Sequence, residues 1–158
     1  MTEFRLEKLL WDDTDFDVMG WHDATIWSMC ADTERFEYLV DLDYIFNWVD
    51  PGPDETYYKF WVSPVTMVFE NASNVRIDLE SQQGSIEIAD LHREMLGPSP
   101  NGKYIQYNFR FECQEGAVSL QGTGYRMHVR RPPSLLGFQS FSLSARGGIS
   151  FSRNSDET

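Results

Sequence analysis

Two aspartates at alternate positions of one strand-like segment are the first residues that could do chemistry. Asp41 and Asp43 lie in YLVDLDYIFNW, residues 38–48, and period-two geometry places both carboxylates on one face with Cβ atoms about 7 Å apart. His22 and Asp23 precede the neighbouring strand-like segment and could reach them. Histidine plus carboxylates can hold a metal ion or act as acid and base, so a metal-assisted enzyme is one hypothesis. The simpler interpretation is that His22 hydrogen-bonds to a neighbouring carboxylate or backbone carbonyl.

The segment DDTDFD concentrates carboxylates and resembles the start of a calcium-binding loop. Its acidic residues are Asp12, Asp13, Asp15 and Asp17. Read from Asp13 as the first loop position, the sixth position is Val18 where an EF-hand needs glycine, and the twelfth is Ala24 where it needs glutamate. The sequence therefore predicts a solvated acidic loop, with an irregular calcium or magnesium site as the alternative.

Signatures of nucleophilic and phosphate chemistry are absent from the sequence. There is no G-x-S-x-G or S-x-x-K motif, and the GTG at residues 122–124 lies inside a strand pattern with no helix after it. Cys30 and Cys113 each sit in apolar-alternating segments, which is typical of buried free thiols. We therefore expect no covalent catalysis and no cofactor, and a non-catalytic protein is favoured over an enzyme.

The charge of the chain is strongly negative and unevenly placed. The net charge is −12, and residues 1–94 carry 21 of the 25 acidic and 6 of the 13 basic side chains. Such a front half repels phosphate groups, so binding to nucleic acid or to an anionic membrane is disfavoured. A basic protein partner would be steered toward it. The simpler interpretation of the charge is solubility.

Four arginines in the second half of the chain could form a small basic patch. They are Arg110, Arg126, Arg130 and Arg131. In an acidic protein such arginines more often form internal ion pairs with carboxylates than bind phosphate. Internal pairing is therefore the favoured interpretation, and phosphate recognition is the alternative.

Bulky rings accompany the acidic residues near the middle of the chain. The segment YYKFW, residues 57–61, has rings on both faces of an expected strand, and Trp48 precedes the turn DPGPDE. Burial between two layers is the commoner explanation, and a partner surface of aromatics ringed by carboxylates is the other. Under the second explanation we predict a contact surface for a basic protein that comprises Asp12, Asp13, Asp15, Asp17, Asp41, Asp43, Trp48 and Trp61.

The elements that would position these residues are mainly strands. Apolar and polar residues alternate in five segments separated by turn residues, at 24–30, 37–46, 75–80, 85–91 and 105–113. The spacing predicts two hairpins, one joining 24–30 to 37–46 and one joining 75–80 to 85–91. The last of the five segments has the cleanest alternation, so we expect it to lie at or near the centre of a sheet.

Further features refine this pattern. Thr2 as an N-cap, followed by leucines at helical spacing, predicts a short helix within residues 2–11. Pro64 should bend its strand or bring it to an edge, and the glycines at 122 and 124 should mark a bulge or bend. Residues 138–145, FQSFSLSA, could form one more strand.

About eight short strands with a short N-terminal helix indicate a mainly β domain, either an antiparallel β-sandwich or a partly open barrel. The length of 158 residues suits a single domain, assigned to residues 1–152, with a flexible C-terminal tail at 153–158. No apolar run approaches the roughly 20 residues that cross a bilayer, and the N-terminus lacks a secretory signal pattern. We therefore expect a cytoplasmic protein. Homo-oligomerisation stays open, because the sequence does not say which strand would pair.

Several segments resemble an uncharacterised family of small bacterial domains, namely GWHDATIW, LVDLDYIFNWV, YYKFWVSPVTMVFENASNVRIDLE and IEIADLHRE. The likeness covers about residues 9–94 and implies no reaction, so no catalytic or cofactor residue follows from it. In size and charge the chain also resembles immunity partners of bacterial toxins. We therefore predict a non-catalytic acidic binding protein, with an immunity-type inhibitor of a basic bacterial toxin as its specific form. A small-molecule-binding β domain is a further alternative.

Overall fold

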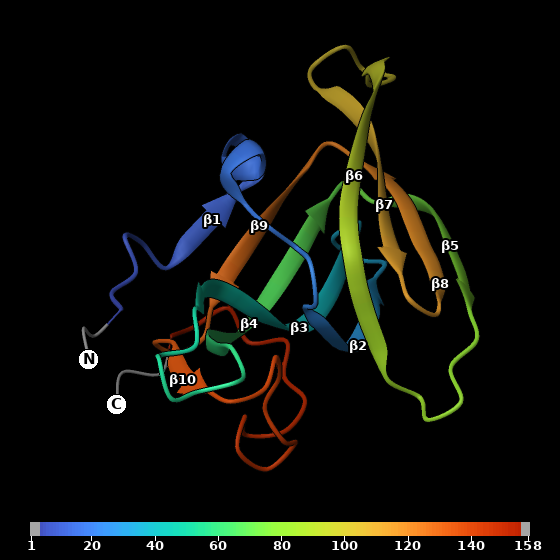
Figure 1. The fold of residues 1–158 in the computed structure, drawn as a ribbon. Helices are drawn as coiled ribbons and strands as arrows, with labels where there is room; N and C mark the ends of the chain where they lie inside the picture. The colour runs from blue at the N-terminus through green and yellow to red at the C-terminus, as the bar shows by residue number, and fades with distance from the viewer. Residues whose placement is uncertain (1–3, 156–158) are drawn as a thin grey trace.

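The computed structural model describes residues 4–155, which form one open antiparallel sheet (Figure 1). Strands make up 53% of the described residues and helix 4%, which confirms the mainly β prediction with ten strands in place of about eight. The order across the sheet is β1-β9-β4-β3-β2-β6-β7-β8-β5, and β10 pairs with β4 beside that path. The elements are β1 (Leu10–Asp12), the 3-10 helix η1 (Asp13–Val18), β2 (Thr25–Asp32), β3 (Glu37–Val49), β4 (Lys59–Glu70), β5 (Ser73–Leu79), β6 (Ile86–Pro98), β7 (Ile105–Cys113), β8 (Gly116–Gly122), β9 (Gly124–Val129) and β10 (Ser134–Leu136).

The first predicted hairpin is confirmed, because β2 and β3 pair antiparallel. β7 has a neighbour on each side, β6 and β8, but it is the third strand from the end that β5 forms, and β2 lies at the centre. Along β3, Val40, Leu42 and Tyr44 face the core, as the alternation of the segment requires. The opposite face of β3, which carries the two aspartates, is buried as well. The second layer over that face comes from the C-terminal part of the chain.

The main core contains side chains from strands on both sides of the β2–β6 junction. At this junction β2 and β6 pair through only two residue pairs. Four aromatic rings from β4, β7 and β9 contact one another there, with centroids 5.2 to 5.9 Å apart: Phe69, Phe109, Phe111 and Tyr125. The chain passes from β8 to β9 through Thr123, so the predicted bend between the two glycines is confirmed. A Cβ on Gly122 would lie 2.9 Å from the Glu70 carbonyl oxygen, which explains the glycine.

The short helix lies later in the chain than the leucine spacing predicts. Residues 2 and 3 are outside the described part, residues 4–9 have no helical turn, and Leu10–Asp12 is strand β1. The helix is η1, in the acidic segment. It begins there because the Asp12 carboxylate accepts from the Thr14 N–H while the Asp15 carboxylate accepts from the Asp12 N–H.

Two strand predictions are corrected as well. β5 pairs with β8, and β6 pairs with β2 and β7, so residues 75–80 and 85–91 form no hairpin. Alternation predicts a strand without naming its partner. Pro64 lies inside β4, which has neighbours on both sides. It is tolerated because the pairing on one side of β4 changes there from β10, whose first residue lies opposite Val62, to β9, whose last residue lies opposite Val65.

Residues 137–153 form no strand and instead cover the face of β3 and β4 that the main core does not use. We call them the C-terminal segment; it lies beside β10 and β4 at the bottom of Figure 1. The expected strand at 138–145 is therefore absent, because side-chain hydrogen bonds to the sheet face replace a strand ladder. A second apolar cluster forms under the segment from Ile45, Phe60, Val62 and Phe141.

The end of the described chain is held to the sheet by an ion pair. Arg153 donates to Glu37 on β3 at 2.5 Å, so the predicted flexible tail has an ion pair at its first residue. Residues 156–158 lie outside the described part of the chain. Within residues 4–155, no helix has the length and apolar character that crossing a membrane requires.

Candidate functional site

Asp41 and Asp43 are buried beneath the C-terminal segment. Both residues are 0% exposed. Their strand turns them toward the covered face of the sheet, where Arg130 and Arg146 form ion pairs with them. Their predicted role in partner binding is therefore wrong, because the fold uses both carboxylates internally and no partner can reach them in the folded chain.

Arg146 is the centre of this buried ion-pair network. Its guanidinium donates to Asp41 at 2.6 and 2.8 Å and to Asp43 at 3.0 Å. Arg130 donates to Asp41 at 2.8 Å and to the Thr66 hydroxyl at 2.8 Å, as the internal-pairing interpretation expects. Burial disfavours the charge on Arg146, but the two carboxylates outweigh it and raise the pKa of that guanidinium.

Asp43 is held as a carboxylate in spite of its burial. Burial is the largest influence and raises the pKa of Asp43 above its usual range, although Arg146, the Trp27 indole and the Phe141 backbone each lower that pKa. All three of these neighbours are donors: Trp27 Nε1 at 2.8 Å, Phe141 N at 3.0 Å and Arg146 Nε at 3.0 Å. A protonated carboxyl would need an acceptor for its own proton, so the ionised form fits the site. The network holds the C-terminal segment on the sheet and leaves neither carboxylate free for chemistry.

The acidic segment before β2 is only partly solvated. Its first residue caps η1, and Asp15 accepts from Lys8 Nζ at 2.6 Å. The hydrogen bond from Lys8 lowers the pKa of Asp15. Asp13 lies against Gly124, the first residue of β9. A Cβ added at Gly124 would be 2.7 Å from the Asp13 carboxylate. Asp17 is exposed, so the predicted solvated loop describes this residue better than its three acidic neighbours.

The predicted metal constellation does not assemble. His22 Nε2 lies 3.5 Å from the Asp23 carboxylate, but Asp41 and Asp43 belong to the arginine network. Among residues 4–155, no group of three or more His, Cys, Asp or Glu side chains could hold a metal ion. His22 Nδ1 lies 3.3 Å from the Ala89 carbonyl oxygen, as the simpler interpretation of this histidine expects. The hypothesis of a metal site formed by His22, Asp23, Asp41 and Asp43 is therefore wrong.

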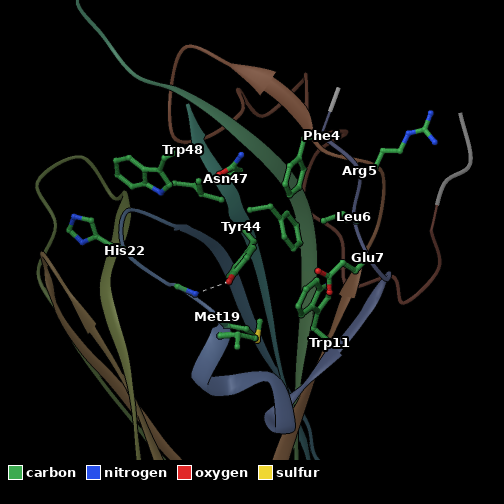
Figure 2. A pocket seen from close by; sticks show the side chains of 14 residues that line it. Phe4, Arg5, Leu6, Glu7, Trp11, Met19, His22, Tyr44, Asn47 and Trp48 are labelled. Carbon is green, nitrogen blue, oxygen red and sulfur yellow. Dashed lines mark hydrogen bonds between the residues drawn. The ribbon is translucent and has the colours of Figure 1, made fainter. Parts of the chain in front are cut away.

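A pocket of about 560 Å³ opens at one end of the main core, and we call it the mouth pocket (Figure 2). Trp11 and the N-terminal segment form one side, His22 and Trp48 form the other, and Tyr44 lies between them. The Tyr44 hydroxyl accepts from the Gly20 N–H at 3.0 Å. Burial raises the pKa of Tyr44 to about 12, so the hydroxyl keeps a proton that it can donate.

Trp48 also belongs to an exposed group of rings that we call the aromatic patch. The patch comprises Trp48, Tyr57, Tyr58 and Phe138. These residues line a depression of about 790 Å³ between the loop that joins β3 to β4 and the start of the C-terminal segment. Tyr57 is 81% exposed and Phe138 76% exposed. Large rings at such exposure, gathered in one place, are typical of a binding surface.

The β3–β4 loop, which forms one side of the aromatic patch, carries several carboxylates. Asp50, Asp54 and Glu55 lie on this loop, and Glu55 pairs with Lys59 at 3.3 Å. Among the charged residues from 50 to 59, three are therefore acidic and one is basic. The patch thus combines apolar area with an adjoining acidic loop, which is the composition predicted for a surface that meets a basic protein.

Trp61 lies outside the aromatic patch. It stands within β4 between Asn47 of β3 and Leu135 of β10, and its ring stacks on Phe4 with centroids 6.1 Å apart. Of the two aromatic residues predicted to contact a partner, Trp48 lies on the exposed surface and Trp61 is half-buried. The two tyrosines of YYKFW carried a usable signal in the sequence. Phe138 did not, because its segment resembled a strand.

A group of carboxyls lies at the β2–β6 junction. Asp23, Glu87 and Glu115 converge there, and the Glu87 backbone N–H donates to Glu115 at 2.7 Å. A hydrogen bond with Asp23, followed by burial and the charges of Asp23 and Glu115, raises the pKa of Glu87 to about 7. Asp23 and Glu87 line a shallow pocket of about 490 Å³. This pair can take up or release a proton near neutral pH.

Neither cysteine has a disulfide partner among residues 4–155. Cys113 is buried, as expected, and burial raises the pKa of its thiol to about 11. Cys30 is exposed, so the prediction of a buried thiol is wrong for this residue. It lies on β2 opposite Leu39, on the face of the hairpin that the main core does not use.

No family model, curated protein or solved structure matches the chain. The resemblance to a family of small bacterial domains therefore stays a prediction.

Proposed function

We propose that the protein is a non-catalytic binding protein whose contact surface is the aromatic patch and whose partner is a basic protein. The supporting observation is the exposure of four large rings around one depression, next to the β3–β4 loop, which carries Asp50, Asp54 and Glu55. An immunity-type inhibitor of a basic bacterial toxin is the specific form of this proposal. The contact surface proposed now consists of exposed residues, whereas the surface predicted from the sequence included the buried Asp41 and Asp43.

The energy of such a contact would come from the rings. Tyrosine and tryptophan supply large contact areas at a low cost in side-chain entropy, and they are enriched where protein partners meet. Trp48 is already held in place, because its ring contacts Phe60 at 4.9 Å and Tyr58 at 6.0 Å between centroids. A partner side chain inserted beside Trp48 would therefore meet a preformed wall, which lowers the cost of binding.

The charge of the chain selects the partner. A net charge of −12 gives the surface a negative potential that attracts a basic protein and repels an acidic one. The only lysine on the β3–β4 loop side of the patch, Lys59, is already paired with Glu55. Lysine or arginine side chains of a partner would thus find the exposed Asp50 and Asp54 on the same loop as Tyr57.

Selection from a random peptide library displayed on phage tests the proposal with a defined probe. We expect the wild-type chain to enrich peptides in which lysine or arginine flanks an aromatic or large apolar residue. The double variant Tyr57→Ser with Phe138→Ser should lose that enrichment. A control variant, Ile77→Ser with Met95→Ser, removes two exposed apolar side chains elsewhere and should keep the enrichment. Enrichment of neutral or acidic peptides, or none above the double variant, would refute the proposal.

The mouth pocket favours a second candidate function, the binding of a small aromatic molecule. Its volume of about 560 Å³ lies in the usual range for such sites, and Tyr44 offers a hydroxyl proton among aromatic walls. A titration with indole, followed by the methyl resonances of the methionines, checks it. The Met19 methyl should shift because Met19 lines the pocket, and the exposed Met95 serves as the control. An unmoved Met19 signal would dismiss this candidate.

A further inference from the structure

β5 ends the sheet on one side, and its outer edge has no strand beside it within residues 4–155. The strand at the other end of the sheet, β1, has three residues, whereas β5 has seven and pairs with β8 alone (Figure 1). A free strand edge exposes backbone donors and acceptors that can pair with another strand. β5 is therefore the longer of the two terminal edges that a second chain could extend.

The two faces of β5 differ in character. Arg76 and Asp78 stand opposite Ser119 and Ala117 of β8 and line a shallow hollow with them. Ile77 stands opposite Val118, which is fully buried in the main core. Side chains of directly opposed residues lie on the same face of a sheet, so Ile77 continues the core layer.

This core layer ends abruptly at the edge. Ile77 is 53% exposed and Val75 is 40% exposed, although the residue of β8 opposite Ile77 is 0% exposed. Branched apolar side chains on the core face of a terminal strand leave apolar area in water that one more strand would cover. An edge protected against pairing would carry a charge pointing into this layer instead.

The sequence of β5 is complementary to itself when two copies lie antiparallel. With Ile77 opposite Ile77 of a second copy, Arg76 stands opposite Asp78 and Asp78 opposite Arg76, while Val75 meets Leu79. A two-fold axis through Ile77 thus forms two opposite-charge pairs on one face and an apolar cluster on the other. The charge pairs and the apolar cluster therefore form in the same register of the two strands.

Neighbouring registers are disfavoured by the same charges. Centring the pair on Arg76 would place two arginines opposite each other, and centring it on Asp78 would oppose two aspartates. Toward the N-terminus, the register with β8 shifts between Ser73 and Arg76, and Asn74 has φ of 51°, so the regular edge starts near Val75. The charges and this irregularity together specify a pairing centred on Ile77.

We propose that the protein forms a two-fold homodimer in which the β5 strands of two copies pair antiparallel, centred on Ile77. The sheets of the two copies then continue into one. This inference is independent of the proposed function, because the aromatic patch lies on other elements. Loss of the dimer would leave peptide binding by the patch intact, and loss of the patch would leave the dimer intact.

Sedimentation velocity of the full chain tests the dimer through charge reversal. We expect concentration-dependent dimerisation of the wild type between roughly 1 and about 200 μM. Arg76→Asp and Asp78→Arg should each raise the dimer dissociation constant by at least about tenfold, because each turns two attractive pairs into two repulsive ones. The double variant R76D/D78R restores opposite charges across the axis and should return dimerisation to near the wild-type level.

Two controls show whether a loss of dimer comes from the strand pairing or from unfolding or a change in net charge. The two single variants change the net charge in opposite directions, and melting scans of each show whether the monomer still folds. Arg35→Asp, an equal charge reversal at an exposed turn, should leave the dimer unchanged. A wild type that stays monomeric over this range, or a double variant as weak as the singles, would overturn the proposal.

Discussion

Arg146 connects the C-terminal segment to β3 through the two buried aspartates, and its side chain is fully buried. Arg146→Met would remove the cation and keep most of the apolar stem. We expect a loss of about 3–5 kcal/mol in the free energy of unfolding, because Asp43 would remain buried without its counter-charge. Urea unfolding measures the loss.

Arg153→Met is the matched control for this change. Arg153 also binds a carboxylate on β3, but at a partly exposed site where water screens the charges. Its loss should cost under about 1 kcal/mol. Equal costs for the two variants would contradict the structural role assigned to the buried network.

Glu87 makes folding depend on pH at the β2–β6 junction. Its pKa is about 7 in the folded chain against an ordinary 4.5, so in that interval the folded chain holds a proton that the unfolded chain has released. The stability from this proton is complete below about pH 4.5 and is lost as the pH rises through about 7. The Glu87→Gln variant keeps a neutral hydrogen-bonding group and should lose this part of the pH dependence of Tm.

Thermal melts at several pH values, run on the wild type and on two variants, check this expectation. Glu94→Gln is the control, because Glu94 is exposed on the same strand, β6. Its Tm should follow the wild-type curve throughout. Parallel curves for Glu87→Gln and the wild type would show that the carboxyl pair does not share a proton.

At the scale of elements, the turn between β7 and β8 depends on Gly116. This residue has φ of 143°, and an added Cβ would lie 2.0 Å from the Asp78 carbonyl oxygen of β5. Gly116→Ala should therefore cost at least about 1–3 kcal/mol and disturb the β5–β8 pairing. Gly20→Ala, at a site with open space and no positive φ, should stay within about 0.5 kcal/mol of the wild type in the same unfolding experiment.

The strands and the first hairpin could be predicted from sequence because their information is local. β3 and β7 alternate over nine or more residues, and a short polar turn joins β2 to β3. The partner of β5 could not be predicted, since several strands offer a similar alternation. The burial of Asp41 was equally hidden, because its counter-charge on Arg146 lies 105 residues away in the chain. The plain interpretation of the arginines as internal partners pointed to part of that network.

At the scale of the whole molecule, burying two aspartates does not remove the negative field. Asp41 and Asp43 are neutralised locally, but the chain still carries a net charge of −12, and the β3–β4 loop keeps its carboxylates at the surface. Long-range attraction of a basic partner depends on this total charge, while the duration of the contact depends on the rings it meets. The two properties can therefore be separated in kinetic measurements.

The most direct test of the central claim is the association rate constant of the chain with a lysine-rich peptide selected on the aromatic patch, measured at low and high salt. The rate should fall steeply as salt screens the negative field. The Tyr57→Ser variant with Phe138→Ser should keep that salt dependence and dissociate faster. An association rate that does not change with ionic strength, together with unchanged dissociation in the double variant, would contradict binding of a basic partner at this surface.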